Sequence, residues 1–138
     1  IVCTTYIPDS APDFFGYLPG YDRLTTIKPD VTAFDTVILL DYTQLPRTHL
    51  EQEVLQHSRV ISIDHHYDNT KKATINLVVP EAAATAHILF PLLKRCSIKS
   101  LYVTSRRHNR IGVKVVFLMD HCVLNHILDT IFRNPYVS

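Results

Sequence analysis

Short apolar runs and polar segments alternate along this chain in the manner of an α/β protein. Two short runs predict buried strands of a parallel sheet: residues 36–41, apolar from Val37 to Leu40 and ended by Asp41, and residues 60–63, apolar except at position 62 and directly followed by Asp64. Between them, residues 49–57 carry apolar side chains at about helical spacing, which predicts a short helix. Strand, helix and strand form a βαβ unit whose right-handed crossover makes the strands parallel. Both acids are therefore expected at the same edge of the sheet.

The remaining segments extend this pattern in both directions. Residues 1–6 predict a first strand, and residues 7–30, which carry Pro and Gly, predict a connection with turns. Residues 74–79 predict an edge strand, and residues 82–94 predict a helix with a kink or a restart at Pro91. The expected fold is an α/β domain with three α/β/α layers and a mostly parallel sheet.

Length and composition favour one soluble, cytoplasmic domain. The 138 residues are 46% hydrophobic and 20% charged, which is ordinary for a globular chain. No apolar run approaches the ~20 residues that span a bilayer, and the start lacks the charges of a signal peptide. We expect no membrane partner, and we expect the sequence to begin partway through a longer protein. The odd cysteine count fits a reduced compartment, and Cys3 is expected to be a small buried residue.

The net charge of +1 conceals an asymmetry between the two halves of the chain. Residues 1–69 hold ten acids against four Lys and Arg, whereas residues 70–138 hold three acids against ten. Seven basic residues and no acid lie between Ala82 and Met119. This imbalance is compatible with an anionic partner such as nucleic acid and equally with a solvated basic face.

The tip of the second predicted strand carries Asp64, His65 and His66. Ligands of open α/β sheets bind at the carboxyl ends of the strands. Because successive side chains of an extended chain point in opposite directions, we expect Asp64 and His66 to face one way and His65 the other. Carboxylate and imidazole ligands suit Mn²⁺, Fe²⁺ or Zn²⁺ better than Ca²⁺. On their own, the three residues fit a solvated polar loop as well as a metal and phosphate site.

Four segments, at 17–20, 34–47, 61–66 and 75–87, match a known family in their order and spacing. Agreement of four segments is more specific than a single Asp-His-His. Together they resemble the DHH phosphoesterase superfamily, specifically its nanoRNase and phosphoadenosine-phosphate phosphatase branch. Residues 61–66 match the naming motif, and residues 34–47 match the family's second motif. The resemblance covers about residues 7–94.

The resemblance implies a phosphoester hydrolase with two divalent metal ions, usually Mn²⁺. Position by position, it implies that Asp41 bridges two metals, that His65 ligates one and that His66 faces the phosphate. Asp64 would orient this cluster from close range, as outer carboxylates fix the tautomers of imidazole ligands. Two cations about 4 Å apart clamp an attacking water and a phosphoryl oxygen, and a bridging carboxylate offsets their repulsion.

Two further side chains are predicted to bind substrate. Arg47 lies within the second motif, and Thr85 lies near the start of the predicted second helix, where its hydroxyl would donate to a phosphate. Thr85 is equally expected to cap or pack. His49 and His57 are expected to be surface residues.

The chain also departs from the family. The first motif, a His and two Asp on an earlier strand tip, has no match before Asp41 and is expected upstream of Ile1. The family's later Thr-Asp-Thr-Gly-like turn has no match in residues 95–138, and His87 stands where a Glu is frequent. We also expect the family's substrate-binding carboxy-terminal domain to have no counterpart within these 138 residues. We therefore expect a partial DHH domain over residues 1–94. Residues 95–138 are either a natural divergent end or a different reading frame.

The sequence thus predicts an incomplete fragment of a metal-dependent phosphoesterase that hydrolyses short oligoribonucleotides or a nucleoside 3′,5′-bisphosphate. The full-length protein is a possible homodimer. Two alternatives share its features. A pyrophosphatase-like phosphoanhydride hydrolase would use the same metal cluster, and a non-catalytic nucleotide- or nucleic-acid-binding remnant would use the basic second half.

Overall fold

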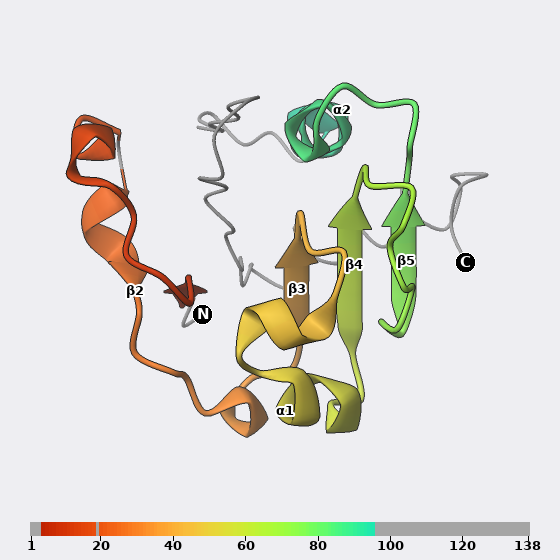
Figure 1. Cartoon of the computed structure of the whole chain (residues 1–138), viewed down its shortest axis with the longest axis horizontal. Helices are drawn as coiled ribbons and strands as arrows, with labels where there is room; N and C mark the ends of the chain where they lie inside the picture. Colours follow the sequence, from red (N-terminus) through yellow and green to blue (C-terminus); the bar gives the residue numbers. More distant parts are fainter. Residues whose placement is uncertain (1–3, 19, 96–138) are drawn as a thin grey trace.

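The computed structural model describes residues 4–18 and 20–95 and centres them on a three-stranded sheet (Figure 1). Its strands are β3 (Val37–Leu40), β4 (Val60–Asp64) and β5 (Ile75–Val78), in that order and all parallel. Val37 pairs with Val60 at one end, and Asp64 pairs with Val78 at the other. The predicted α/β class and parallel sheet are confirmed.

Short elements surround this sheet. Strands β1 (Thr5–Tyr6) and β2 (Leu24–Thr25) form a separate parallel pair. The sequence pattern predicted a strand at β1, but it did not predict β2, which lies within the expected connection. Single turns of 3₁₀ helix are η1 (Asp13–Phe15), η2 (Tyr21–Arg23), η3 (Val31–Ala33) and η4 (Leu45–Thr48).

The two α-helices are shorter than the predicted ones. Helix α1 (Glu51–Gln56) occupies the βαβ crossover and lies towards the amino ends of the strands (Figure 1). Helix α2 (Thr85–Arg95) begins above the carboxyl ends, three residues later than predicted, because residues 81–84 form turns that cross the strand tips. The helix runs through Pro91, so it does not restart there, and the alternative expectation of a kink stays a prediction.

Side chains divide between the two faces of the sheet. Val37, Leu39 and Val60 share one buried cluster with Leu50 and Val54 from the α1 side. By the two-residue alternation of strands, Ile61 and Ile63 face the other way. Helix α2 packs on β4, and none of its residues whose side chains are described belongs to the α1 cluster. This separation is what a layered α/β fold requires.

Replacing a central core residue is expected to destabilise the fold strongly. Ile61 lies on the middle strand and is 0% exposed, so Ile61→Ala leaves a cavity and should cost about 2–5 kcal/mol. Ile27 is 79% exposed, and Ile27→Ala should change the free energy of unfolding by less than about 0.5 kcal/mol. Urea unfolding of the full chain measures both. Equal midpoints for the two variants would contradict the assigned core.

Several sequence predictions fall outside the described residues. They are the start of the first strand at 1–3, the burial of Cys3, and the nature of the basic segment from residue 96 onward. In the part of the chain that is described, no helix combines the length and apolar character needed to cross a membrane.

Candidate metal centre

Asp41 sits where the chain leaves β3. Its φ of 62° lies in the left-handed region, which Asp tolerates better than most residues. The Asp41 N–H still donates to the Ile63 carbonyl at 3.1 Å, so the sheet pairing reaches this residue. The Thr85 hydroxyl, at the first position of α2, donates to Asp41 Oδ1 at 2.7 Å. A strand tip and a helix start thus hold one carboxylate between them.

Asp64 turns the chain at the end of β4. Its side chain is 0% exposed, and Oδ1 accepts the backbone N–H groups of His65 at 2.8 Å and His66 at 3.3 Å. The same oxygen lies 2.7 Å from His66 Nδ1. These bonds end the extended conformation at Asp64, and the strict alternation of side chains ends with it.

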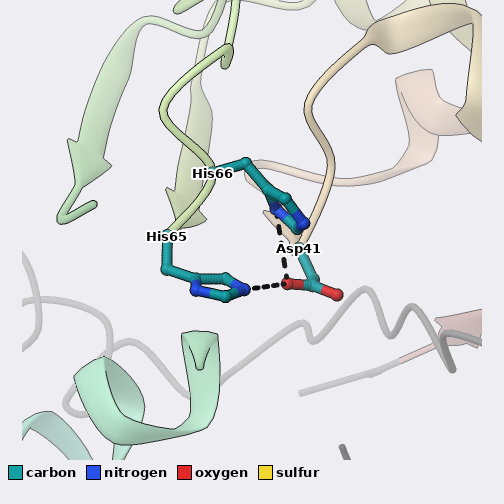
Figure 2. A group of neighbouring side chains, drawn as sticks. All are labelled: Asp41, His65 and His66. Atoms are coloured by element: carbon teal, nitrogen blue, oxygen red, sulfur yellow. Dashed lines mark ion pairs between the residues drawn. The ribbon is translucent and has the colours of Figure 1, made fainter. Parts of the chain in front are cut away.

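His65 and His66 therefore converge instead of facing opposite ways, and that sequence prediction was wrong. His65 Nε2 lies 3.7 Å from Asp41 Oδ1, and His66 Nδ1 lies 3.8 Å from the same oxygen. The two ring centroids are 4.5 Å apart. Figure 2 shows both imidazoles directed at the Asp41 carboxylate. Among the described residues, these three make the one group of His, Cys, Asp or Glu with ligand atoms all within 4.8 Å of one another.

The hydrogen bonds decide which imidazole nitrogens carry protons. His65 Nδ1 lies 3.1 Å from the Ala82 carbonyl, which can only accept, so Nδ1 donates. In the neutral ring, Nε2 then presents a lone pair towards Asp41 Oδ1. Two electron-rich atoms face each other, and a cation between them resolves the repulsion. Ligand atoms each about 2.1 Å from one cation lie roughly 3–4 Å apart, so the observed spacing fits.

The predicted substrate-binding residues lie in different settings. Thr85 is buried, and its hydroxyl donates its single proton to the Asp41 carboxylate. Thr85 therefore contacts the metal centre through Asp41. Arg47 is exposed on η4, a turn that packs against α1. Substrate binding by either residue stays a prediction.

Among the other histidines, His57 differs from its prediction as a surface residue. Its Nε2 lies 2.8 Å from the Phe34 carbonyl, and Nδ1 accepts the Arg59 N–H at 3.2 Å. The ring therefore fastens the end of α1 to the segment before β3. His49 is exposed, as predicted.

Asn69 is part of the centre, and sequence reasoning missed it. Its amide contacts Asp64 Oδ2 at 2.6 Å and the Tyr42 carbonyl at 2.8 Å. An Asn in a polar loop is too common to signal such a role. Burial raises the pKa of the neighbouring Tyr42 phenol, which therefore stays protonated and adds no charge beside Asp41.

A comparison with protein families adds to this geometry. Residues 2–119 match the model of the DHH family, N-terminal domain. The chain belongs to the DHH family. A search of curated proteins finds no match. Members of the DHH family are phosphohydrolases that depend on divalent metals, which accords with the cluster of Asp41, His65 and His66. The match continues past residue 94 to residue 119, and the predicted domain boundary at 94 stays a prediction.

Proposed function

We propose that this DHH protein is a Mn²⁺-dependent phosphoesterase that acts on short oligoribonucleotides or a nucleoside 3′,5′-bisphosphate. The observation that carries the proposal is the arrangement of His65, whose proton is committed to the Ala82 carbonyl and whose free lone pair faces Asp41. A neutral imidazole and a carboxylate are ligands that Mn²⁺ accepts. The DHH family supplies the reaction class, a phosphohydrolysis.

Each side chain then has a distinct task. Asp41 and His65 hold the cation, and Thr85 fixes the Asp41 carboxylate by its hydrogen bond. Asp64 accepts the Nδ1 proton of His66, which leaves Nε2 as the nitrogen that would take a proton from the attacking water and, once protonated, would donate it to the leaving-group oxygen. The metal would supply Lewis-acid stabilisation of the phosphoryl charge and a more acidic bound water.

A second cation needs more ligands than this cluster offers. The described residues supply Asp41, His65 and His66, and the resemblance assigns the rest to a motif of one His and two Asp that has no match before Asp41. Binding of the first cation is therefore tested separately from hydrolysis.

An exposed aromatic ring supports a substrate that carries a base. Tyr67 follows His66 directly and is 89% exposed. A ring placed beside a phosphate site can stack on a nucleobase, and such stacking contributes about 1–3 kcal/mol per base. Pyrophosphate has no base that could stack on this ring. Substitution of Tyr67 therefore distinguishes a phosphoesterase that acts on nucleotides from a pyrophosphatase-like phosphoanhydride hydrolase.

The test measures Mn²⁺-dependent hydrolysis of a diribonucleotide, a nucleoside 3′,5′-bisphosphate and pyrophosphate by wild type and by Tyr67→Ala. We expect preference for a base-bearing substrate, with a KM for it that rises about 5- to 100-fold in Tyr67→Ala. Phe90→Ala removes another exposed aromatic ring, on α2, and should leave KM unchanged.

Three outcomes would contradict the proposal. Faster hydrolysis of pyrophosphate, with no effect of Tyr67→Ala, would support a phosphoanhydride hydrolase. RNA binding that weakens steeply with salt and ignores chelator would support a non-catalytic remnant. Absence of Mn²⁺ binding by calorimetry would remove the metal centre itself.

A further inference from the structure

The carboxylate of Asp64 is fully buried, and its two oxygens have different partners. Oδ1 accepts the N–H groups of His65 and His66 and faces His66 Nδ1. Oδ2 is held by Asn69, whose Nδ2 lies 2.6 Å away. A buried charge without a partner is strongly unfavourable, so each of these contacts matters to the position of the carboxylate. Among the described residues, Asn69 is the side chain that holds Oδ2.

The orientation of the Asn69 amide follows from its neighbours. Nδ2 faces two acceptors, Asp64 Oδ2 and the Tyr42 carbonyl at 2.8 Å, and Oδ1 accepts the Lys71 N–H at 2.8 Å. Because a reversed amide would place an oxygen against two oxygens, only this orientation satisfies the three contacts. Both Asn69 amide protons are therefore committed.

These contacts join the two strand tips that form the centre. Asp64 ends β4, and Tyr42 follows Asp41 at the end of β3. The next residue continues the connection, because the Thr70 N–H donates to the Thr43 carbonyl at 3.2 Å. The loop after His66 is thus hydrogen-bonded to the loop after Asp41, and Asn69 supplies the side-chain contact between them.

We propose that Asn69 is a positioning residue of the metal centre. By holding Asp64 Oδ2, it keeps Oδ1 on His66 Nδ1, and this fixes the His66 tautomer with the lone pair on Nε2. By holding the Tyr42 carbonyl, it sets the distance between that imidazole and Asp41. The inference concerns the same site as the proposed function and rests on it for its catalytic consequence. The tautomer itself is a property of the metal-free chain.

The first measurement therefore needs neither metal nor substrate. Long-range ¹H–¹⁵N NMR correlations of the His66 ring, recorded on the full metal-free chain at about pH 8.5 to observe neutral rings, report which nitrogen carries the proton. Wild type should show protonated Nδ1 and bare Nε2. Asn69→Ala should show a mixture of the two tautomers. Asn69→Asp, which keeps the size but replaces the donor by a second carboxylate, should disturb the ring more than Asn69→Ala.

The second measurement follows the cation. Asn69 also holds the carbonyl of Tyr42, the residue that directly follows the proposed ligand Asp41. Because loss of an outer partner of a metal site reduces metal affinity or activity about 10- to 100-fold, we expect a fall of this size in Mn²⁺ affinity for both variants. The control is Asn76→Ala. Asn76 is also buried, and its side-chain amide exchanges two hydrogen bonds with the Ala73 backbone just before β5. Asn76→Ala should lower the urea midpoint and should leave the His66 tautomer and the Mn²⁺ affinity unchanged.

The two ideas fail in different ways. A His66 tautomer identical in wild type and Asn69→Ala, together with Mn²⁺ affinity within twofold, would overturn the role of Asn69 while leaving the phosphoesterase proposal intact. A tautomer that shifts in Asn69→Ala in a chain that binds no Mn²⁺ would support the positioning role and overturn the metal centre. A stability loss equal to that of Asn76→Ala without any tautomer change would reduce Asn69 to a structural residue.

Discussion

His65→Ala is expected to abolish Mn²⁺ binding and any hydrolysis that depends on it. The substitution removes the imidazole whose Nδ1 is anchored on Ala82 and whose Nε2 faces Asp41 at 3.7 Å. Loss of an outer partner already lowers metal affinity about 10- to 100-fold, so loss of a direct ligand should lower it by more than about 100-fold. Calorimetric titration with Mn²⁺ measures the affinity, and dinucleotide hydrolysis measures the activity.

The control for this prediction is His49→Asn. His49 is exposed, and its φ of 57° lies in the left-handed region that Asn tolerates. The substitution removes an imidazole while keeping the backbone conformation, and it should leave both the Mn²⁺ affinity and the hydrolysis rate at the wild-type value. Hydrolysis that persists in His65→Ala and remains sensitive to chelator would show that the metal is held elsewhere.

The strands of the centre were predictable because their sequence pattern has a single physical cause. The strands of a parallel sheet are buried on both faces, so residues 37–40 are all apolar, and residues 60–63 are apolar except for the small, buried Ser62. The polar residue that ends each run then marks a strand tip, and the crossover rule brings Asp41 and Asp64 to one edge. The DHH resemblance rests on these same positions and is confirmed by the family match over residues 2–119.

The arrangement beyond the strand tips was not predictable from periodicity. His65 and His66 face the same carboxylate because Asp64 Oδ1 accepts both of their backbone N–H groups, and no repeat in the sequence encodes that turn. Likewise, α2 starts at Thr85 and not at Ala82, since residues 81–84 cross the tips and provide the carbonyl that His65 needs. Side-chain to backbone bonds of this kind override local propensity at the site.

Asp41→Asn is expected to remove the stabilisation that Mn²⁺ gives the fold. Asn keeps the size of the side chain, tolerates φ of 62° and retains an oxygen for the Thr85 hydroxyl, so the metal-free fold should persist. It loses the negative charge that a cation requires. At a Mn²⁺ concentration of 100 times Kd, wild type should gain about 2.7 kcal/mol and its Tm should rise by several degrees. Asp41→Asn should show no such rise.

Thermal unfolding with EDTA and with Mn²⁺ separates the loss of metal from the loss of fold. The control is Asp35→Asn, which removes one negative charge from an exposed side chain just before the amino end of β3. Asp41 lies just beyond the opposite, carboxyl end of the same strand. All three chains should melt together in EDTA, because none of these substitutions opens the core. In Mn²⁺, wild type and Asp35→Asn should rise together while Asp41→Asn stays at its EDTA value. A Mn²⁺-induced rise of equal size in Asp41→Asn would show that the carboxylate is not a metal ligand, and it would leave His65 and His66 as side chains of a strand tip that binds phosphate without a cation.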